Sequence, residues 1–102
     1  MKLSEKIHTG GQKFYSYPYR VYFLECGGDE KPQRIFSVPK KIFKRAVKRN
    51  LVRRRTKEAF RHVSGSYPVL ETRHIMLVYT ATEIMDYGKI LEGLEAALGK
   101  IG

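Results

Sequence analysis

One segment, residues 40–61, constrains the fold of this 102-residue chain more than any other. It contains 11 of the 20 Lys and Arg residues and a single acid, Glu58, so its net charge of +10 equals that of the whole chain. At about 100° per residue its apolar and basic side chains separate onto opposite sides, which predicts an amphipathic helix from Phe43 to Val63. The expected core face consists of Val52, Thr56, Ala59, Phe60 and Val63. The opposite face, within an arc of roughly 100°, consists of Asn50, Arg53, Arg54, Lys57 and Arg61.

The basic face also constrains the function. A charged helix face is usually plain solvated surface, but such a face mixes Lys with Glu so that opposite charges pair at i,i+4. Here no acid interrupts the cations, and like charges at this spacing repel each other. We therefore expect a polyanionic partner, with nucleic acid favoured over an anionic membrane surface. The helix lacks the Trp- and Leu-rich apolar face that is typical of membrane-surface helices.

The N-terminal third predicts a short helix and one aromatic strand. Residues 1–9 allow a helix with Leu3 and Ile7 four residues apart. Residues 14–24 predict a single strand rich in aromatic and β-branched side chains, in which Pro18 indicates an edge position or a bulge. One face of this strand would carry Tyr17, Tyr19, Val21 and Phe23, and the other Arg20, Tyr22 and Leu24. A Tyr on a sheet beside a basic helix could stack on unpaired bases, although core packing explains any single Tyr equally well.

The remaining pattern completes one domain over residues 1–102. Residues 34–38 and 74–80 predict two further strands, and Asp86 is expected to cap a second amphipathic helix. The apolar positions of that helix are Ile90, Leu91, Leu94, Ala97, Leu98 and Ile101. The elements read from the residues are thus helix, two strands, helix, strand, helix, an α/β sandwich. Residues 34–80 form a βαβ unit, whose crossover the general rule makes right-handed.

No enzyme site is apparent in the sequence. His8, His62 and His74 lack a neighbouring nucleophile motif, so a structural or surface role is the expectation for each. The carboxylates form no metal-binding motif, and the glycine pairs lack the context of a phosphate-binding loop. A lone cysteine, Cys26, excludes an internal disulfide and suits a reducing cytosol. With no stretch of transmembrane length either, we expect a cytoplasmic protein.

Residues 37–61 resemble the signature of the bacterial ribonuclease P protein subunit. In that family S-V-x-K-K/R leads into a helix with A-V-x-R-N-R-x-K-R-x-x-R/K-E-A-F/Y. The matching positions here are Ser37, Val38, Lys40, Lys41, Ala46, Val47, Arg49, Asn50, Arg53, Arg54, Lys57, Glu58, Ala59 and Phe60. The chain departs from the pattern at Leu51, which replaces the second Arg of R-N-R, and at Arg55 and Thr56, where the family is usually apolar. Leu3 and Ile7 stand where the family's first helix carries aromatic residues.

The resemblance implies an α+β fold, a two-layer sandwich with a small mixed sheet of about four strands. It also implies the order αβββαβα and a left-handed βαβ crossover, against the general rule. The implied function is that of the protein subunit of ribonuclease P, which assists removal of the 5′ leader from precursor tRNA. The RNA subunit, with bound Mg²⁺, would carry out the hydrolysis, so no catalytic residue and no metal ligand is expected in this chain.

The implied partners are ribonuclease P RNA and precursor tRNA, with no membrane and no obligate protein partner. The expected RNA-binding residues are Lys40, Lys41, Lys48, Arg49, Asn50, Arg53, Arg54, Lys57 and Arg61. The expected leader-binding residues are Tyr22, Ile7 and Leu3. The same charge pattern would also fit a non-enzymatic structural RNA-binding protein of ribosomal type, which is the alternative reading.

Overall fold

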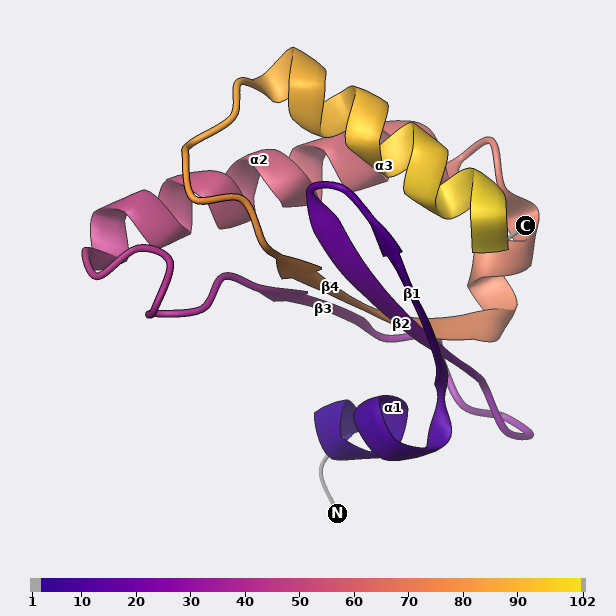
Figure 1. Ribbon diagram of the computed structural model, residues 1–102. Helices are drawn as coiled ribbons and strands as arrows, with labels where there is room; N and C mark the ends of the chain where they lie inside the picture. Colours follow the sequence, from indigo (N-terminus) through magenta and orange to yellow (C-terminus); the bar gives the residue numbers. More distant parts are fainter. Residues whose placement is uncertain (1–2, 102) are drawn as a thin grey trace.

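A mixed four-stranded sheet organises the chain, with two long helices on one face and one short helix on the other (Figure 1). The computed structural model describes residues 3–101, with side chains from residue 5 onward. In chain order the elements are α1 (Leu3–Gly10), β1 (Gln12–Ser16), β2 (Tyr19–Glu25), β3 (Arg34–Ser37), α2 (Ala46–Ser64), the 3₁₀ helix η1 (Pro68–Thr72), β4 (Arg73–Tyr79) and α3 (Tyr87–Ile101). The strand order in the sheet is β1-β2-β4-β3. This confirms the α+β class and the element order that the resemblance implied.

The single strand expected over residues 14–24 is wrong, because the segment folds into a hairpin. β1 and β2 pair antiparallel, and Ser16 faces Tyr19 across a turn formed by Tyr17 and Pro18. Pro18 interrupts the segment because a proline cannot donate a hydrogen bond between strands. The sequence did not indicate a turn there, since aromatic residues typical of a strand continue on both sides. The predicted alternation within β2 is confirmed, since Val21 points into the main core and Tyr22 into a separate cluster on the other face.

The unit β3–α2–β4 is a crossover, because β3 and β4 pair in parallel. Its left-handed sense stays a prediction. α2 begins at Ala46 instead of Phe43, since the preceding residues form a turn in which the Ile42 N–H donates to the Pro39 carbonyl (3.1 Å). Phe43 is nevertheless buried, with its ring centroid 6.2 Å from that of Tyr79. It therefore belongs to the core, although it lies before the start of the helix.

The predicted core face of α2 is confirmed in full. Its buried residues are Val52, Thr56, Ala59, Phe60 and Val63. The Phe60 ring meets that of Phe36 edge to face at 5.5 Å, and the Tyr19 hydroxyl shares a buried 2.7 Å hydrogen bond with the Thr56 hydroxyl. Burial raises the pKa of Tyr19, so the phenol remains neutral at this contact. These contacts fix the orientation of α2 about its axis, and therefore which of its side chains face outward.

The C-terminal part also follows the sequence, with one addition. The Lys89 N–H donates to Asp86 Oδ1 (2.9 Å), which confirms the expected cap of α3. The buried residues of α3 are Ile90, Leu94, Ala97, Leu98 and Ile101. The 3₁₀ helix η1 was not predicted, since its residues carry no helical period, but its Leu70 is fully buried in the core.

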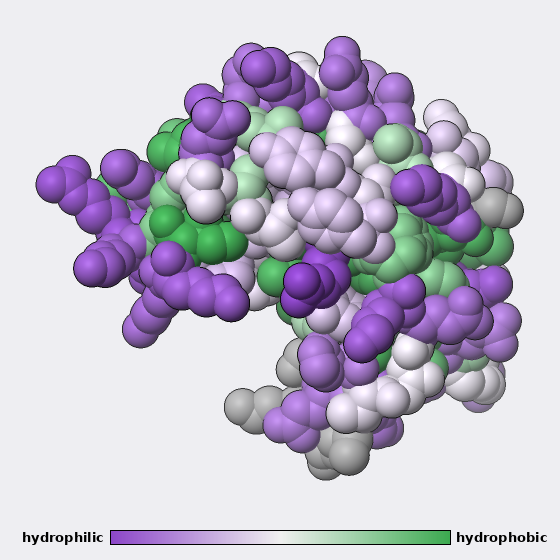
Figure 2. Space-filling view, in the orientation of Figure 1, coloured by the Kyte–Doolittle hydropathy of each residue, from purple (hydrophilic) through white to green (hydrophobic). Residues whose placement is uncertain are grey.

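The second face of the sheet is only partly covered. α1 lies across it (Figure 1) and buries Ile7 against Tyr22 and Met76 in a cluster of its own, beside the half-buried Ile35 and Val78. In the same orientation, the molecular surface is hollowed between α1 and the end of the molecule that holds the start of α2 (Figure 2). The hollow leaves the rest of this sheet face accessible to a ligand.

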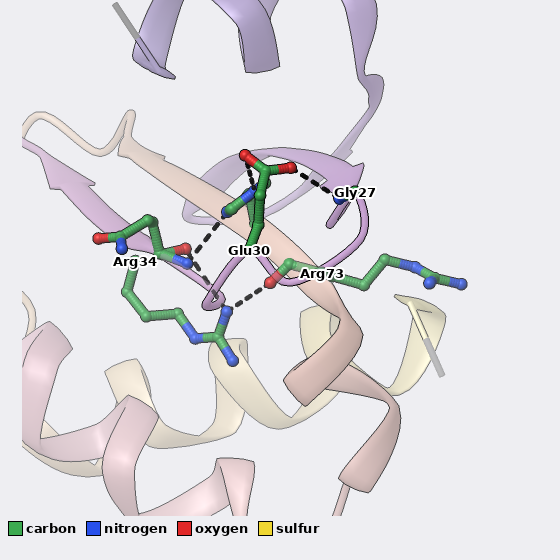
Figure 3. A network of polar contacts seen from close by, with 6 residues as sticks. Gly27, Glu30, Arg34 and Arg73 are labelled. Atoms are coloured by element: carbon green, nitrogen blue, oxygen red, sulfur yellow. Dashed lines mark hydrogen bonds and ion pairs between the residues drawn. The ribbon is translucent and has the colours of Figure 1, made fainter.

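A polar network ties the β2–β3 connection to β4 (Figure 3). Glu30 accepts a hydrogen bond from the Gly27 N–H (2.7 Å), which lowers the pKa of its carboxyl group, and it lies 3.7 Å from Nε2 of His74. Nδ1 of His74 accepts from the Gln33 N–H (3.1 Å). Arg34 donates to the carbonyl of Arg73 (2.6 Å). His74 is therefore a buried structural residue, as expected.

Candidate nucleic-acid interface

The outward side of α2 presents a group of cations, and the one acid of the helix, Glu58, lies at the edge of this group. Asn50, Arg54, Lys57 and Arg61 are exposed, and at 100° per residue they fall within an arc of about 60° on the side opposite the core. Lys48 is also exposed, in the first turn of α2, but it lies outside this arc, about 160° from Asn50 around the helix. Figure 2 shows hydrophilic side chains projecting from the end of the molecule where α2 begins. This part of the predicted interface is thus available to a partner.

The segment before α2 extends the cationic surface. Lys40 and Lys41 are exposed on the turn that follows β3, as an RNA-binding role requires. Lys44 and Arg45 are exposed as well, although they were absent from the predicted RNA-binding set. Their charge was the only available signal, because the expected helix start at Phe43 placed them inside the helix instead of on the segment that enters it.

Two signature arginines lie differently from the rest. Arg49 and Arg53 are half-buried, and both guanidinium groups donate to backbone carbonyls: Arg49 to Phe43 and Lys44 (both 2.8 Å), Arg53 to Phe36 (3.2 Å). Arg53 also donates to the side-chain oxygen of Asn50 (2.9 Å). The sequence had placed Arg53 among the outward cations, but it sits at the border of the buried stripe.

The predicted leader-binding set does not form an open surface. Ile7 is 0% exposed and Tyr22 only 5%, because the two pack together beneath α1. Ile7 therefore stabilises α1 on the sheet and cannot touch a ligand in this conformation. The ring of Tyr22 lies 5.0 Å from that of the exposed His8. Leu3 begins α1, but its side chain lies outside the described part of the chain.

Beside Tyr22 lies an aromatic and cationic hollow that the sequence did not single out. It is lined by Lys13, Phe14, Tyr15, Arg20 and Tyr22. Tyr15 is 54% exposed, and the strand register places it opposite Arg20 on the same sheet face as Tyr22. The alternation of residues 14–24 could not reveal this pairing, because it arises only when the segment folds back as a hairpin.

The one acid of α2, Glu58, is exposed one turn from Arg54 and from Arg61, but within residues 3–101 it forms no ion pair with either. Residues 3–101 contain two ion pairs, Arg73 with Glu25 (3.1 Å) and the contact of His74 with Glu30, and neither involves α2. The same residues contain no group of three or more His, Cys, Asp or Glu side chains suited to a metal ion. Among the described helices, none is both long and apolar enough to cross a bilayer.

Comparisons of the sequence with known proteins identify one family. The family model described as Ribonuclease P matches residues 5–102. The ribonuclease P protein component of Porphyromonas gingivalis strain ATCC 33277 is 32% identical over 112 aligned positions, which cover 97% of this chain and 80% of that protein. The sequence from strain W83 of the same species matches equally well.

Solved structures have the same fold. The ribonuclease P protein of Thermotoga maritima superposes with a TM-score of 0.83 at 23% identity, covering 99% of this chain and 93% of that one. That of Staphylococcus aureus gives a TM-score of 0.80 at 21% identity, covering 99% and 92%. The chain therefore belongs to the ribonuclease P protein family, and it is a subunit of the tRNA 5′-processing ribonucleoprotein whose RNA component is ribonuclease P RNA.

Proposed function

We propose that this chain docks on ribonuclease P RNA through α2 and the segment before it, and that it holds the 5′ leader of precursor tRNA on the accessible sheet face. One observation carries the proposal. Arg54, Lys57 and Arg61 point outward together with Asn50, and within residues 3–101 none of these three cationic side chains has a hydrogen-bonded or ionic partner. RNA phosphates would supply those partners.

The electrostatics of α2 favour this assignment. Exposed like charges three or four residues apart destabilise a helix by about 0.2–0.5 kcal/mol per pair, so the arrangement costs stability in the free protein. Phosphate oxygens relieve the repulsion, and Arg can bind them through two parallel hydrogen bonds. Each phosphate that is neutralised also releases counterions, so the affinity should fall steeply with salt.

For the leader, the hollow beside Tyr22 is the best-supported site. An unpaired base could stack on the exposed ring of Tyr15, while Lys13 and Arg20 neutralise the adjoining phosphates. Tyr22, which is 5% exposed, would form part of the wall of this hollow, and the fully buried Ile7 would support Tyr22 from beneath instead of contacting the RNA. Stacking on an aromatic ring and attraction to phosphates do not depend on base identity, so we infer a binding mode with little sequence preference.

The catalytic step belongs to the RNA in this proposal. Residues 3–101 contain no group of three or more His, Cys, Asp or Glu side chains that could hold a metal ion. We propose that the Mg²⁺ ions are held mainly by the RNA subunit, and no step is assigned to this chain through them. What the chain supplies is binding energy, because it shields the repulsion between two RNAs and holds the leader. We propose a cytoplasmic location, in keeping with a single half-buried cysteine.

Paired binding measurements test the leader site. The wild-type chain and a Tyr15→Ala variant are each assembled with ribonuclease P RNA, and the affinity for precursor and mature tRNA is measured. A lost stack should weaken precursor binding by about 1–3 kcal/mol and leave mature tRNA binding unchanged, because mature tRNA has no leader. Tyr17→Ala is the matched control, since Tyr17 is equally exposed at 56% but lies in the turn. Equal losses for both tRNAs, or for both variants, would contradict the assignment.

A further inference from the structure

The arginines of α2 divide into two groups by what their guanidinium groups contact. Arg54 and Arg61 are exposed, whereas Arg49, Arg53 and Arg55 are half-buried and donate to backbone carbonyls, Arg55 to that of Met85 outside the segment that enters the helix. We propose that Arg49 and Arg53 are positioning residues, which hold the cationic segment 38–45 and Asn50 in place for RNA binding and do not themselves bind phosphate. This inference rests on the proposed function of α2.

Arg49 fixes the entry into α2. Its Nη1 donates to the carbonyls of Phe43 and Lys44, both at 2.8 Å. The residue at the N-cap position, Arg45, provides no side-chain cap, and the first turn of the helix contains no acid. The usual local devices that would define how the chain enters a helix are thus missing. Arg49 replaces them by holding the entering backbone from within the helix.

Arg53 fixes a second point, at the other end of the same segment. Its Nε donates to the carbonyl of Phe36 in β3 (3.2 Å), and its Nη1 donates to the side-chain oxygen of Asn50 (2.9 Å). One planar group therefore joins the end of β3 to a residue on the outward face of α2. With Arg49, it holds both ends of the segment that carries Lys40 and Lys41.

The contact with Arg53 also determines the orientation of the Asn50 amide. A guanidinium group has donors only, so the atom of Asn50 that faces it must be the oxygen. The NH₂ group of Asn50 is then left for an acceptor outside the protein, such as a phosphate or base oxygen of the RNA. A freely rotating amide would have to be ordered during binding, and the bond from Arg53 removes that cost.

Lys cannot replace Arg in this role. An ammonium group is a compact charge on a flexible stem, and it cannot donate in two fixed directions from one plane. Arg53→Lys therefore keeps the charge but loses the bridge between Phe36 and Asn50. Arg54→Lys is the matched control, because Arg54 is the next residue, is exposed, and has no protein partner for its side chain within residues 3–101.

The test measures the affinity of the full-length variants for ribonuclease P RNA over a series of salt concentrations. For Arg54, we expect the Ala variant to lower the salt slope by about 0.7–0.9, the value of one phosphate contact, and the Lys variant to keep the slope and most of the affinity. For Arg53, we expect both the Lys and the Ala variants to lose about tenfold in affinity while the slope stays unchanged. The loss from Arg53→Lys should shrink severalfold in an Asn50→Ala background, since the bridge is already broken there.

Several outcomes would overturn the inference. If Arg53→Ala lowers the slope as Arg54→Ala does, and Arg53→Lys restores the affinity, then Arg53 binds phosphate. Independent effects of Arg53 and Asn50 would also contradict it, and thermal melting of each variant separates these effects from unfolding. If Arg54→Ala changes neither affinity nor slope, the proposed RNA-binding face of α2 is itself wrong, which is a different failure.

Discussion

The positive charge of Lys57 should favour RNA binding but destabilise the helix of the free protein. It is exposed on the outward face, with Arg53 and Arg54 one turn before it and Arg61 one turn after it. Its three like-charge neighbours each cost about 0.2–0.5 kcal/mol. Lys57→Gln preserves helix propensity and removes all three pairs, so the free protein should become more stable by about 0.6–1.5 kcal/mol at low salt. In a domain of this size that corresponds to a rise in melting temperature of several degrees.

The same substitution should weaken RNA binding. A charge-assisted hydrogen bond contributes about 1.5–3 kcal/mol, so the affinity for ribonuclease P RNA should fall roughly ten- to hundredfold. Thermal melting at low and high salt is the first assay, and RNA titration is the second. The gain in stability should vanish near 1 M salt, where the screening length is only about 3 Å. Lys89→Gln, an exposed cation on α3, serves as the control. A Lys57→Gln protein that is less stable, or that binds RNA as the wild type does, would refute the reasoning.

Three further predictions concern the stability of the fold. Thr56→Val leaves the buried Tyr19 hydroxyl unpaired and should cost about 1–3 kcal/mol in denaturant unfolding, whereas adding Tyr19→Phe should recover most of that loss. Gly93→Ala places a Cβ 2.7 Å from the ring of Pro18 in the β1–β2 turn, so it should destabilise the fold by about 1–2 kcal/mol although Ala has the better helix propensity. Gly99→Ala is the control, because its Cβ meets only ordinary van der Waals contacts, and it should be neutral or stabilising. The lowered pKa of Glu30 means that its contribution is present above about pH 4.3 and is lost as the pH falls through the lowered value, so the stability difference between wild type and Glu30→Gln should shrink in acid. A difference that grows in acid would contradict the last assignment.

The parts of the fold that the sequence predicted share one property, a long run of periodic side chains. The core face of α2 was predicted residue by residue, because four apolar residues and Thr56 recur at helical spacing from Val52 to Val63. The cap at Asp86 was predictable for a similar reason, since capping depends on a local hydrogen bond. The order with three strands before the long helix and one after it came from the resemblance to the family and not from the periodicity of the residues.

The parts that failed depend on contacts between distant residues. The hairpin at Pro18 was read as one strand, because a single break within an aromatic run looks like a bulge. Ile7 was expected to bind the leader, but the tertiary fold buries it against Tyr22. No local pattern could separate Arg53 from Arg54 either, since only the end of β3, 17 residues away from Arg53, provides the carbonyl that draws it inward.

Reconstituted leader cleavage tests the central claim most directly. Ribonuclease P RNA is incubated with precursor tRNA at low Mg²⁺, alone, with the wild-type chain, or with a variant in which Arg54, Lys57 and Arg61 are all replaced by Gln. All three residues lie opposite the core, so the variant should fold, which thermal melting checks. We predict that the wild-type chain restores removal of the leader and that the variant does not. No stimulation by the folded wild-type chain, or equal stimulation by the variant, would contradict the account.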